Sequence, residues 1–349
     1  MQHEPPKPKP FKVIGYVTGR TNIEAIDASK VTHLNYAFAK VRGDDIVYFE
    51  NDDAPSHLAR LRALEAVNPN LKIILAIGGW GAEWFSDAAL TEGSRCRFAT
   101  SAVELMTSND LDGLDIDWEY PGQRGGGNRF RAEDKQNFTL LLKAVREELD
   151  VVGAGRGRRY TLSIASSGGK YFDFTEMDRL HAYLDWINVM TYDFAGGSSL
   201  VTAHHAQLYA TSGDSTEAYV KQHLAAGIPR EKIVVGIPFY AKEWKWVVNR
   251  KSPTGLGEPY DWYAGELSFA RVRRNYLGAP GFTRGWDAAA HAPYLWNPET
   301  GTFLSYEDEQ SIAEKARFVR ELGLGGLMYW EQSHDPEEVL VEALVGALK

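Results

Sequence analysis

The sequence predicts an α/β fold, a (β/α)₈ TIM barrel that carries a small α+β insertion subdomain between its seventh and eighth strands. Three observations support this prediction: eight short apolar segments recur along the chain, segments with helical periodicity separate most of them, and one connection is far longer than the others. Strands that are apolar along their whole length are typical of parallel sheets, whose two faces are both covered. Eight strand and helix units in 349 residues fit a barrel better than a doubly wound sheet.

Valine, isoleucine and aromatic residues mark the eight predicted strands. They are FKVIGYV from Phe11, VTHLNYAFA from Val31, LKIILAIGGW from Leu71, LDGLDIDW from Leu111, RYTLSIASS from Arg159, LDWINVMTYD from Leu184, KIVVGIPFY from Lys232 and GLGGLMYWE from Gly323. Helical periodicity is found between most of them, as at residues 94–108 and 137–149. No G-x-G-x-x-G motif follows a strand, so a dinucleotide-binding sheet is not indicated.

The predicted domains follow from these segments. Residues 1–10 contain the proline-rich run EPPKPKP, which we expect to be an extended leader. Residues 11–240 and 322–349 form the barrel. Residues 241–321 form the inserted subdomain with the start of the last barrel helix region, and their tryptophan and tyrosine content favours a folded unit over a disordered loop.

Composition restricts the partners and cofactors. A net charge of −9, from 38 basic and 47 acidic residues without a basic run, argues against a nucleic acid or an anionic membrane as partner. The single cysteine, Cys96, excludes an intrachain disulfide and a cysteine-built metal site, and we expect its thiol to be buried on a helix. No apolar run is long enough to cross a membrane, and the start of the chain lacks a signal-peptide pattern. We expect a soluble monomer that uses no metal or other cofactor.

Three acidic residues alternate along the fourth predicted strand, in DGLDIDWEY. Asp115, Asp117 and Glu119 occupy every second position, so their side chains project to one face, the barrel interior. Neighbours on one face of a strand are roughly 6–7 Å apart, which is close enough for the carboxylates to repel one another and for one to keep a proton near neutral pH. Barrel active sites lie at the carboxyl ends of the strands, where Glu119 falls, and a glycosidic leaving oxygen needs such a proton donor.

Two other interpretations of these acids are open. An edge strand with alternating acids would bury Leu114, Ile116 and Trp118 on its other face, as in many antiparallel sheets. Three acids can also bind magnesium or calcium, although no phosphate-binding loop accompanies them here. The surrounding apolar strands favour the barrel interior, and we favour acid catalysis over a metal site.

The pattern D-x-x-D-x-D-x-E, which begins at Asp112, resembles the signature of family 18 glycoside hydrolases, the chitinases and their relatives. Further matching stretches occur in the same order along the whole barrel: GYV with Tyr16, NYAFA with Phe38, IGGW from Ile77, MTYD from Met190, GIPFY from Gly236 and MYWE from Met328. The segment before the last strand is similar to the end of the chitinase insertion domain, which deepens the substrate cleft in one branch of this family.

The resemblance implies a retaining, substrate-assisted mechanism. Glu119 is then the general acid and base, and the nucleophile is the acetamido oxygen of the bound N-acetylglucosamine. Asp117 orients the acetamido group, with Asp115 beneath it as the third acid of the motif. Tyr192 donates its hydroxyl to the acetamido carbonyl. The implied substrate-binding residues are Tyr16, Phe38, Trp80, Met190, Asp193, Tyr240 and Trp330.

Other tryptophans have two equal explanations, because they can line outer sugar subsites or pack in a core. They are Trp84, Trp244, Trp246, Trp262 and Trp286. The chain also departs from the family pattern: Ala76 replaces the usual serine of the third strand, Ala241-Lys242 replaces the usual Gly-Arg, and FAGGSSL lacks the His and Trp often found after MTYD. We expect these differences to change how the sugar is bound while Glu119 and Asp117 stay in place.

The predicted function is hydrolysis of β-1,4-linked N-acetylglucosamine in chitin and chitooligosaccharides. An endo-β-N-acetylglucosaminidase acting on N-glycans shares the series Asp115, Asp117 and Glu119, which we call the ladder, but the insertion argues against this function. A non-catalytic chitinase-like lectin shares the barrel, but such proteins usually lack the acid that Glu119 supplies. The polymeric substrate implies a secreted or extracytoplasmic protein, although no signal is present in the chain.

Overall fold

A computed structural model describes residues 10–349, so the predicted leader at residues 1–10 lies outside the described residues apart from Pro10. Eight parallel strands form a closed barrel, because β1 pairs with both β2 and β14. The prediction of a (β/α)₈ barrel is therefore confirmed. Its strands are β1 (Lys12–Thr18), β2 (His33–Val41), β4 (Lys72–Gly78), β5 (Gly113–Asp117), β6 (Thr161–Ser166), β7 (Trp186–Val189), β8 (Ile233–Pro238) and β14 (Gly326–Trp330).

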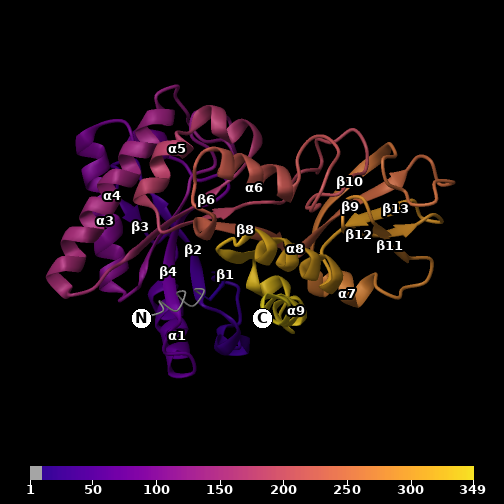
Figure 1. Cartoon of the computed structure of the whole chain (residues 1–349), viewed down its shortest axis with the longest axis horizontal. Helices are drawn as coiled ribbons and strands as arrows, with labels where there is room; N and C mark the ends of the chain where they lie inside the picture. Colours follow the sequence, from indigo (N-terminus) through magenta and orange to yellow (C-terminus); the bar gives the residue numbers. More distant parts are fainter. Residues whose placement is uncertain (1–9) are drawn as a thin grey trace, which may run out of the picture.

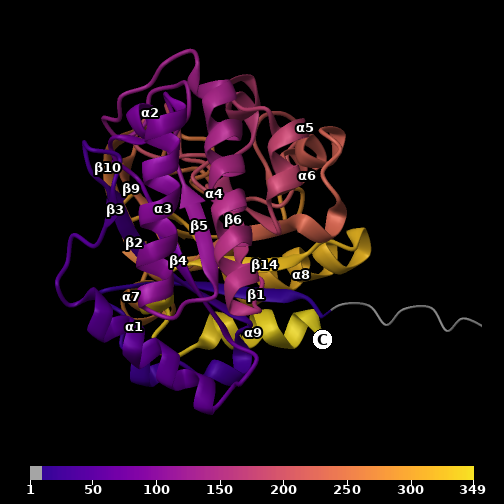
Figure 2. The ribbon, with the colours of Figure 1, turned by 90° about the vertical axis from the view of Figure 1, so that its left-hand side faces the viewer.

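Helices cover the outside of the barrel. Figure 2 shows α3 (Glu92–Ser108) and α4 (Asp134–Arg156) lying over β4, β5 and β6. The remaining α-helices of the barrel are α1 (Ala54–Ala63), α2 (Phe85–Ala88), α5 (Met177–Leu180), α6 (Thr216–Ala225), α8 (Glu309–Leu322) and α9 (Val339–Leu348). No helix within residues 10–349 is long and apolar enough to cross a membrane.

Strand β5 has a polar inner face and an apolar outer face. Its outward side chains Leu114 and Ile116 are fully buried, and the Trp118 ring that follows packs between Phe85 and Phe138. Because β5 pairs with β4 on one side and β6 on the other, the alternative of a solvated edge strand is wrong. The acids of the ladder therefore point into the barrel.

The burial predicted for the single cysteine is wrong. Cys96 lies on α3, as predicted, but its side chain is exposed. The buried stripe of α3 runs through Phe98, Ala102 and Met106 instead, and helical geometry turns residue 96 away from it.

The long connection after β8 folds as a five-stranded antiparallel sheet with the order β10-β9-β13-β12-β11. Figure 1 shows this subdomain beside the barrel, at the right of the view. Buried aromatic rings of Trp244, Trp296 and Phe303 form its core. Its elements are β9 (Tyr240–Val247), β10 (Tyr260–Ser268), α7 (Phe269–Asn275), β11 (Thr283–Asp287), β12 (Ala292–Asn297) and β13 (Thr302–Ser305), and a short strand β3 (Val47–Tyr48) extends the barrel sheet beside β2.

A buried ion pair joins the subdomain to the barrel. Lys315 of α8 lies 2.5 Å from Glu307, which follows the last strand of the subdomain, and both side chains are almost fully buried. The Lys315 ammonium also donates to the carbonyl oxygen of Ala206, in the loop after β7, at 2.6 Å. The segment from Glu307 to Lys315 therefore meets the loop after β7, about a hundred residues earlier in the sequence, at one charged group.

Candidate active site

Asp115 is the deepest of the three acids and accepts hydrogen bonds from three other barrel strands. Tyr16 Oη donates to it at 2.5 Å, Ser163 Oγ at 2.6 Å and Asn188 Nδ2 at 3.1 Å. Its neighbour across the β4–β5 pairing is Ala76, which offers no hydroxyl. Burial raises the pKa of Asp115, and these hydrogen bonds oppose that shift by stabilising the ionised form.

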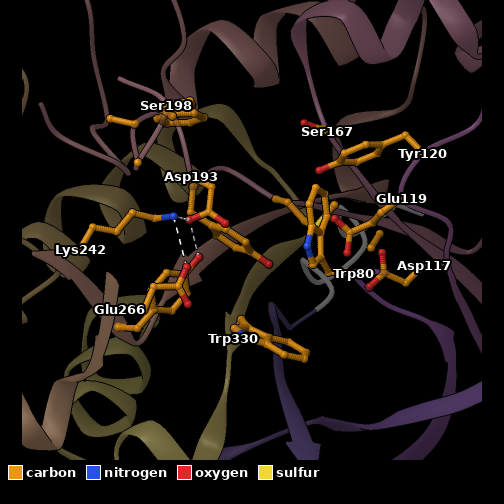
Figure 3. A pocket seen from close by; sticks show the side chains of 18 of the residues that line it. Trp80, Asp117, Glu119, Tyr120, Ser167, Asp193, Ser198, Lys242, Glu266 and Trp330 are labelled. Carbon is orange, nitrogen blue, oxygen red and sulfur yellow. Dashed lines mark hydrogen bonds and ion pairs between the residues drawn. The ribbon is translucent and has the colours of Figure 1, made fainter. Parts of the chain in front are cut away.

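Asp117 and Glu119 lie next along the same face, where Figure 3 shows both side chains at the cavity wall. Burial raises the pKa of Asp117 well above its usual range, and the charges of Glu119 and Asp115 add to that shift. Its Oδ1 is buried without a hydrogen-bond partner among residues 10–349. Burial also raises the pKa of Glu119 to about 7, while the Tyr120 hydroxyl and Lys40 oppose the shift. Both carboxyls therefore hold a proton more tightly than an exposed acid does.

Lys40, at the end of β2, is a charged neighbour that sequence reasoning missed. Its ammonium donates to the carbonyl oxygen of Gly78 at 2.8 Å and lies 5.3 Å from the centre of the Phe38 ring. Its positive charge lowers the pKa of both Asp117 and Glu119. The only sequence signal was its position two residues after Phe38, on the same side of the strand.

A cavity of about 660 Å³ opens above these acids. Aromatic rings form its floor: Phe38 and Trp330 stack with ring centres 5.6 Å apart, and Tyr16 lies 5.5 Å from Trp330. Of the residues predicted for the site, Asp115 alone does not reach the cavity surface. The predicted residues that line the cavity are Tyr16, Phe38, Trp80, Asp117, Glu119, Met190, Tyr192, Asp193, Tyr240 and Trp330.

Asp193 links the barrel wall of the cavity to the inserted subdomain. Tyr240 Oη donates to it at 2.8 Å, and Lys242 Nζ lies 2.7 Å from its carboxylate (Figure 3). Lys242 also pairs with Glu266 of β10, at 3.3 Å. Burial alone would raise the pKa of Asp193, but His205 and Lys242 outweigh it and hold that pKa well below its usual range. Asp193 is therefore ionised in the free protein.

The subdomain and the loop after β7 supply a second set of wall residues that sequence reasoning did not assign to the site. Lys242 was noted only as a departure from the family pattern, yet its side chain is almost buried between two carboxylates. The other unassigned residues of this wall are Phe194, Ala195, Gly196, Gly197, Ser198, Ser199, Tyr263 and Glu266. They lie far apart in the sequence, and only the fold brings them together.

Of the five tryptophans with two open explanations, one packs in a core and none lines the cavity. Trp244 is fully buried in the subdomain core. Trp84 packs on Gly43, with the Arg129 guanidinium over its ring, and Trp286 is partly buried. Trp246 and Trp262 are exposed, and neither lines the cavity. Of the tryptophans considered for sugar subsites, only Trp80 and Trp330 are at the cavity.

Potential metal ligands do not cluster in the part of the chain that the structure describes. No three His, Cys, Asp or Glu side chains within residues 10–349 are arranged to hold a metal ion. Asp115 accepts hydrogen bonds from hydroxyl and amide groups instead, and the charge of Lys40 acts on Asp117 and Glu119.

Comparisons with known proteins agree with this geometry. Residues 12–335 match the family model of glycosyl hydrolases family 18. Chitinase A1 of Niallia circulans is 36% identical over 96% of this chain and 58% of its own length, so the chain spans less than two thirds of that relative. A cell-surface-expressed multi-modular chitinase of Paenibacillus sp. str. FPU-7 is 37% identical, with a TM-score of 0.92 over 97% of this chain and 33% of its own. A family 18 N-acetylglucosaminidase from Paenibacillus barengoltzii is 41% identical, with a TM-score of 0.88 over 97% of this chain and all of its own. The chain belongs to family 18 of the glycosyl hydrolases.

Proposed function

We propose that the protein hydrolyses β-1,4-linked N-acetylglucosamine in chitin and chitooligosaccharides. The observation that carries this proposal is the Asp117–Glu119 pair, two carboxyls with raised pKa values beside a cavity with an aromatic floor. Two of the similar proteins are named as chitinases, which supports the choice of substrate. Flat aromatic rings suit the apolar C–H faces of pyranose rings.

In the first step, protonated Glu119 gives its proton to the glycosidic oxygen and the bond from that oxygen to the anomeric carbon breaks. The acetamido carbonyl oxygen of the same sugar attacks the anomeric carbon and forms a cyclic oxazolinium ion. The partner carboxyl Asp117 accepts the acetamido N–H and balances the positive charge that develops there. The raised pKa of Glu119, about 7, supports its role as the proton donor.

In the second step, the ionised Glu119 takes a proton from a water molecule, which attacks the anomeric carbon as the oxazolinium ring opens. Two inversions at that carbon leave its configuration retained, and Glu119 is protonated again. Tyr192 donates its hydroxyl to the acetamido carbonyl, Asp193 holds the distorted sugar, and Trp330 supports its face. These roles fit side chains that line the cavity, with Asp193 kept ionised by Lys242.

Timed product analysis on chitohexaose, with detection of the anomer first formed, tests this proposal. We expect chitobiose among the early products, with the β-anomer formed first. An initial α-anomer would exclude the substrate-assisted mechanism. The absence of turnover together with tight oligosaccharide binding would favour a lectin.

Release of single N-acetylglucosamine units is a second candidate. The 41% identity to an N-acetylglucosaminidase, across the whole of that protein, favours it. In the chitohexaose experiment it predicts monosaccharide as the first product, with chitopentaose beside it. Cleavage of a high-mannose glycopeptide, with chitohexaose left intact, would favour an endo-β-N-acetylglucosaminidase instead.

We also propose that the protein works as a monomer outside the cytoplasm, because a polymer of this kind does not enter cells. The cavity and its acids lie within one chain, so a second copy is not needed to complete the site. Gel filtration and fractionation of the producing cells test these two points.

A further inference from the structure

Two tryptophan side chains lie exposed against each other on the inserted subdomain. Trp246 is 52% exposed and Trp262 is 46% exposed, and their ring centres are 5.3 Å apart with planes inclined by 34°. Single exposed apolar residues are common on protein surfaces, but two adjacent indole rings form a continuous apolar platform. Neither ring packs into the subdomain core, so core packing does not explain them.

The platform faces away from the cavity. Tyr263 and Glu266 of β10 line the cavity, and they pair with Trp244 and Lys242 of β9. Trp262 pairs with Lys245, and successive side chains of a strand point to opposite faces. Strict alternation would put Trp246 on the side of Trp244, but Trp246 has φ = +54°, which interrupts the extended backbone, and the contact between the two indole rings places Trp246 on the same side as Trp262. The two tryptophans are therefore outside the site already described.

The charge beside the platform is balanced. Lys245 Nζ lies 5.4 Å from the centre of the Trp262 ring and 3.4 Å from Glu243, and Glu243 also accepts a hydrogen bond from Tyr276 Oη at 2.9 Å. An anionic polymer would find the Lys245 ammonium already paired with an acid, and the chain carries a net charge of −9. The surface suits a ligand with flat apolar faces and neutral polar edges, which describes a chain of neutral pyranose rings.

We propose that Trp246 and Trp262 form a second carbohydrate-binding site, which holds a neutral pyranose polysaccharide on the outside of the inserted subdomain. The choice of chitin as the polymer rests on the proposed function. A chain held there keeps the enzyme on the surface of an insoluble substrate while the cavity acts on a neighbouring strand of polymer. Soluble oligosaccharides are short enough to reach the cavity without such help.

The double variant Trp246→Ala and Trp262→Ala tests this site. We expect its adsorption to chitin particles to weaken about tenfold, since truncating aromatic side chains at a binding surface has effects of this size. Its kcat/KM on a soluble chitooligosaccharide should equal that of the parent. Val151→Ala, which removes an exposed apolar side chain from α4, is the matched control and should change neither measurement.

Conservative variants separate binding from folding. Trp246→Phe and Trp262→Phe keep an aromatic face and should retain most of the adsorption, with an unchanged thermal unfolding midpoint. Adsorption of the double alanine variant equal to that of the parent would overturn the proposed site. Equal losses of adsorption and of soluble activity would also overturn it. A parent protein that adsorbs through these tryptophans but cleaves no oligosaccharide would refute the proposed function and leave the site standing.

Discussion

Burial determines the chemistry of single carboxyl groups in this protein. Asp115 is buried with three hydrogen-bond donors, whereas Asp117 is buried with an unpartnered oxygen and Glu119 lies at the cavity. Three carboxyl groups, repeated at intervals of two residues, therefore meet three environments. Of the three, only Asp117 and Glu119, the upper two acids, both line the cavity and have a raised pKa.

Replacing Glu119 with Gln keeps its shape but removes the proton donor. We expect kcat on chitohexaose to fall by about 10²–10⁴-fold, the usual contribution of general acid catalysis, with little change in KM. Glu104→Gln, the same change on the exposed surface of α3, is the control. Product release by Glu119→Gln at the parent rate would refute its catalytic role.

The pKa of Glu119 predicts the alkaline side of the pH profile. Because the Glu119 carboxyl must be protonated to act, kcat/KM should fall as pH rises through about 7. The apparent pKa values read from the profile belong to the coupled acids as a group. Lys40 lowers the pKa of both upper acids, so Lys40→Met should move the alkaline limb to higher pH. An unmoved limb in the Lys40→Met profile would contradict this assignment.

The raised pKa of Glu119 also affects the stability of the fold. A carboxyl whose pKa rises from 4.5 to about 7 on folding binds its proton more tightly in the folded state, so stability falls as pH rises between these values. Glu119→Gln should therefore be more stable than the parent at pH 8, by on the order of 3 kcal/mol at most. The two should be equally stable at pH 4. Urea unfolding at both pH values measures the difference.

At the scale of the elements, glycine is required where β4 approaches β5. Gly78 has φ = +120°, and an added Cβ would lie 2.0 Å from the carbonyl oxygen of Asp117. Gly78→Ala should cost more than about 2 kcal/mol, because it combines backbone strain with overlap against the strand that carries the acids. Gly157→Ala, at the end of α4 with φ = +64° and open space around it, should cost about 1–2 kcal/mol. Chemical unfolding compares the two, and an equal cost would show that the contact with β5 does not matter.

Local sequence patterns predicted most strands and helices, because the formation of a strand or helix depends on residues that are neighbours in sequence. The run of apolar residues predicted each barrel strand, and alternation along β5 placed Asp115, Asp117 and Glu119 on one face. The alternation of side chains along one strand does not predict which side chain of another strand will face an acid. The effect of Lys40 of β2 on Asp117 and Glu119 was therefore missed. The roles of the site residues and the domain boundary at residues 241–321 stay predictions.

Distant contacts were the part that the sequence could not predict. Lys242 meets Asp193 because β9 leaves the barrel directly after β8, and Glu266 joins them only through the pairing of β10 with β9. The exposed thiol of Cys96 shows the same limit, since a helix pattern with small residues on several sides leaves its buried face ambiguous. Tertiary packing decides such cases.

At the scale of the whole molecule, the Lys315–Glu307 pair holds the subdomain against the barrel. Lys315→Met leaves Glu307 buried without its cation, and we expect a loss of about 3–5 kcal/mol in the free energy of unfolding. The double variant Lys315→Met and Glu307→Gln removes both charges and should recover part of that loss. Urea unfolding of the three proteins tests this, and equal stability of the parent and Lys315→Met would contradict it.

The floor of the cavity joins the two ends of the barrel sequence. Phe38 belongs to β2 and Trp330 to β14, and the two strands are neighbours of β1 on opposite sides. During synthesis the acids of β5 are added halfway through the barrel strands, but Trp330 is added only after all seven other barrel strands. A growing chain on the ribosome therefore holds the proton donor well before it can hold a sugar ring against the floor. The order in which the chain is made keeps the site incomplete until the barrel closes.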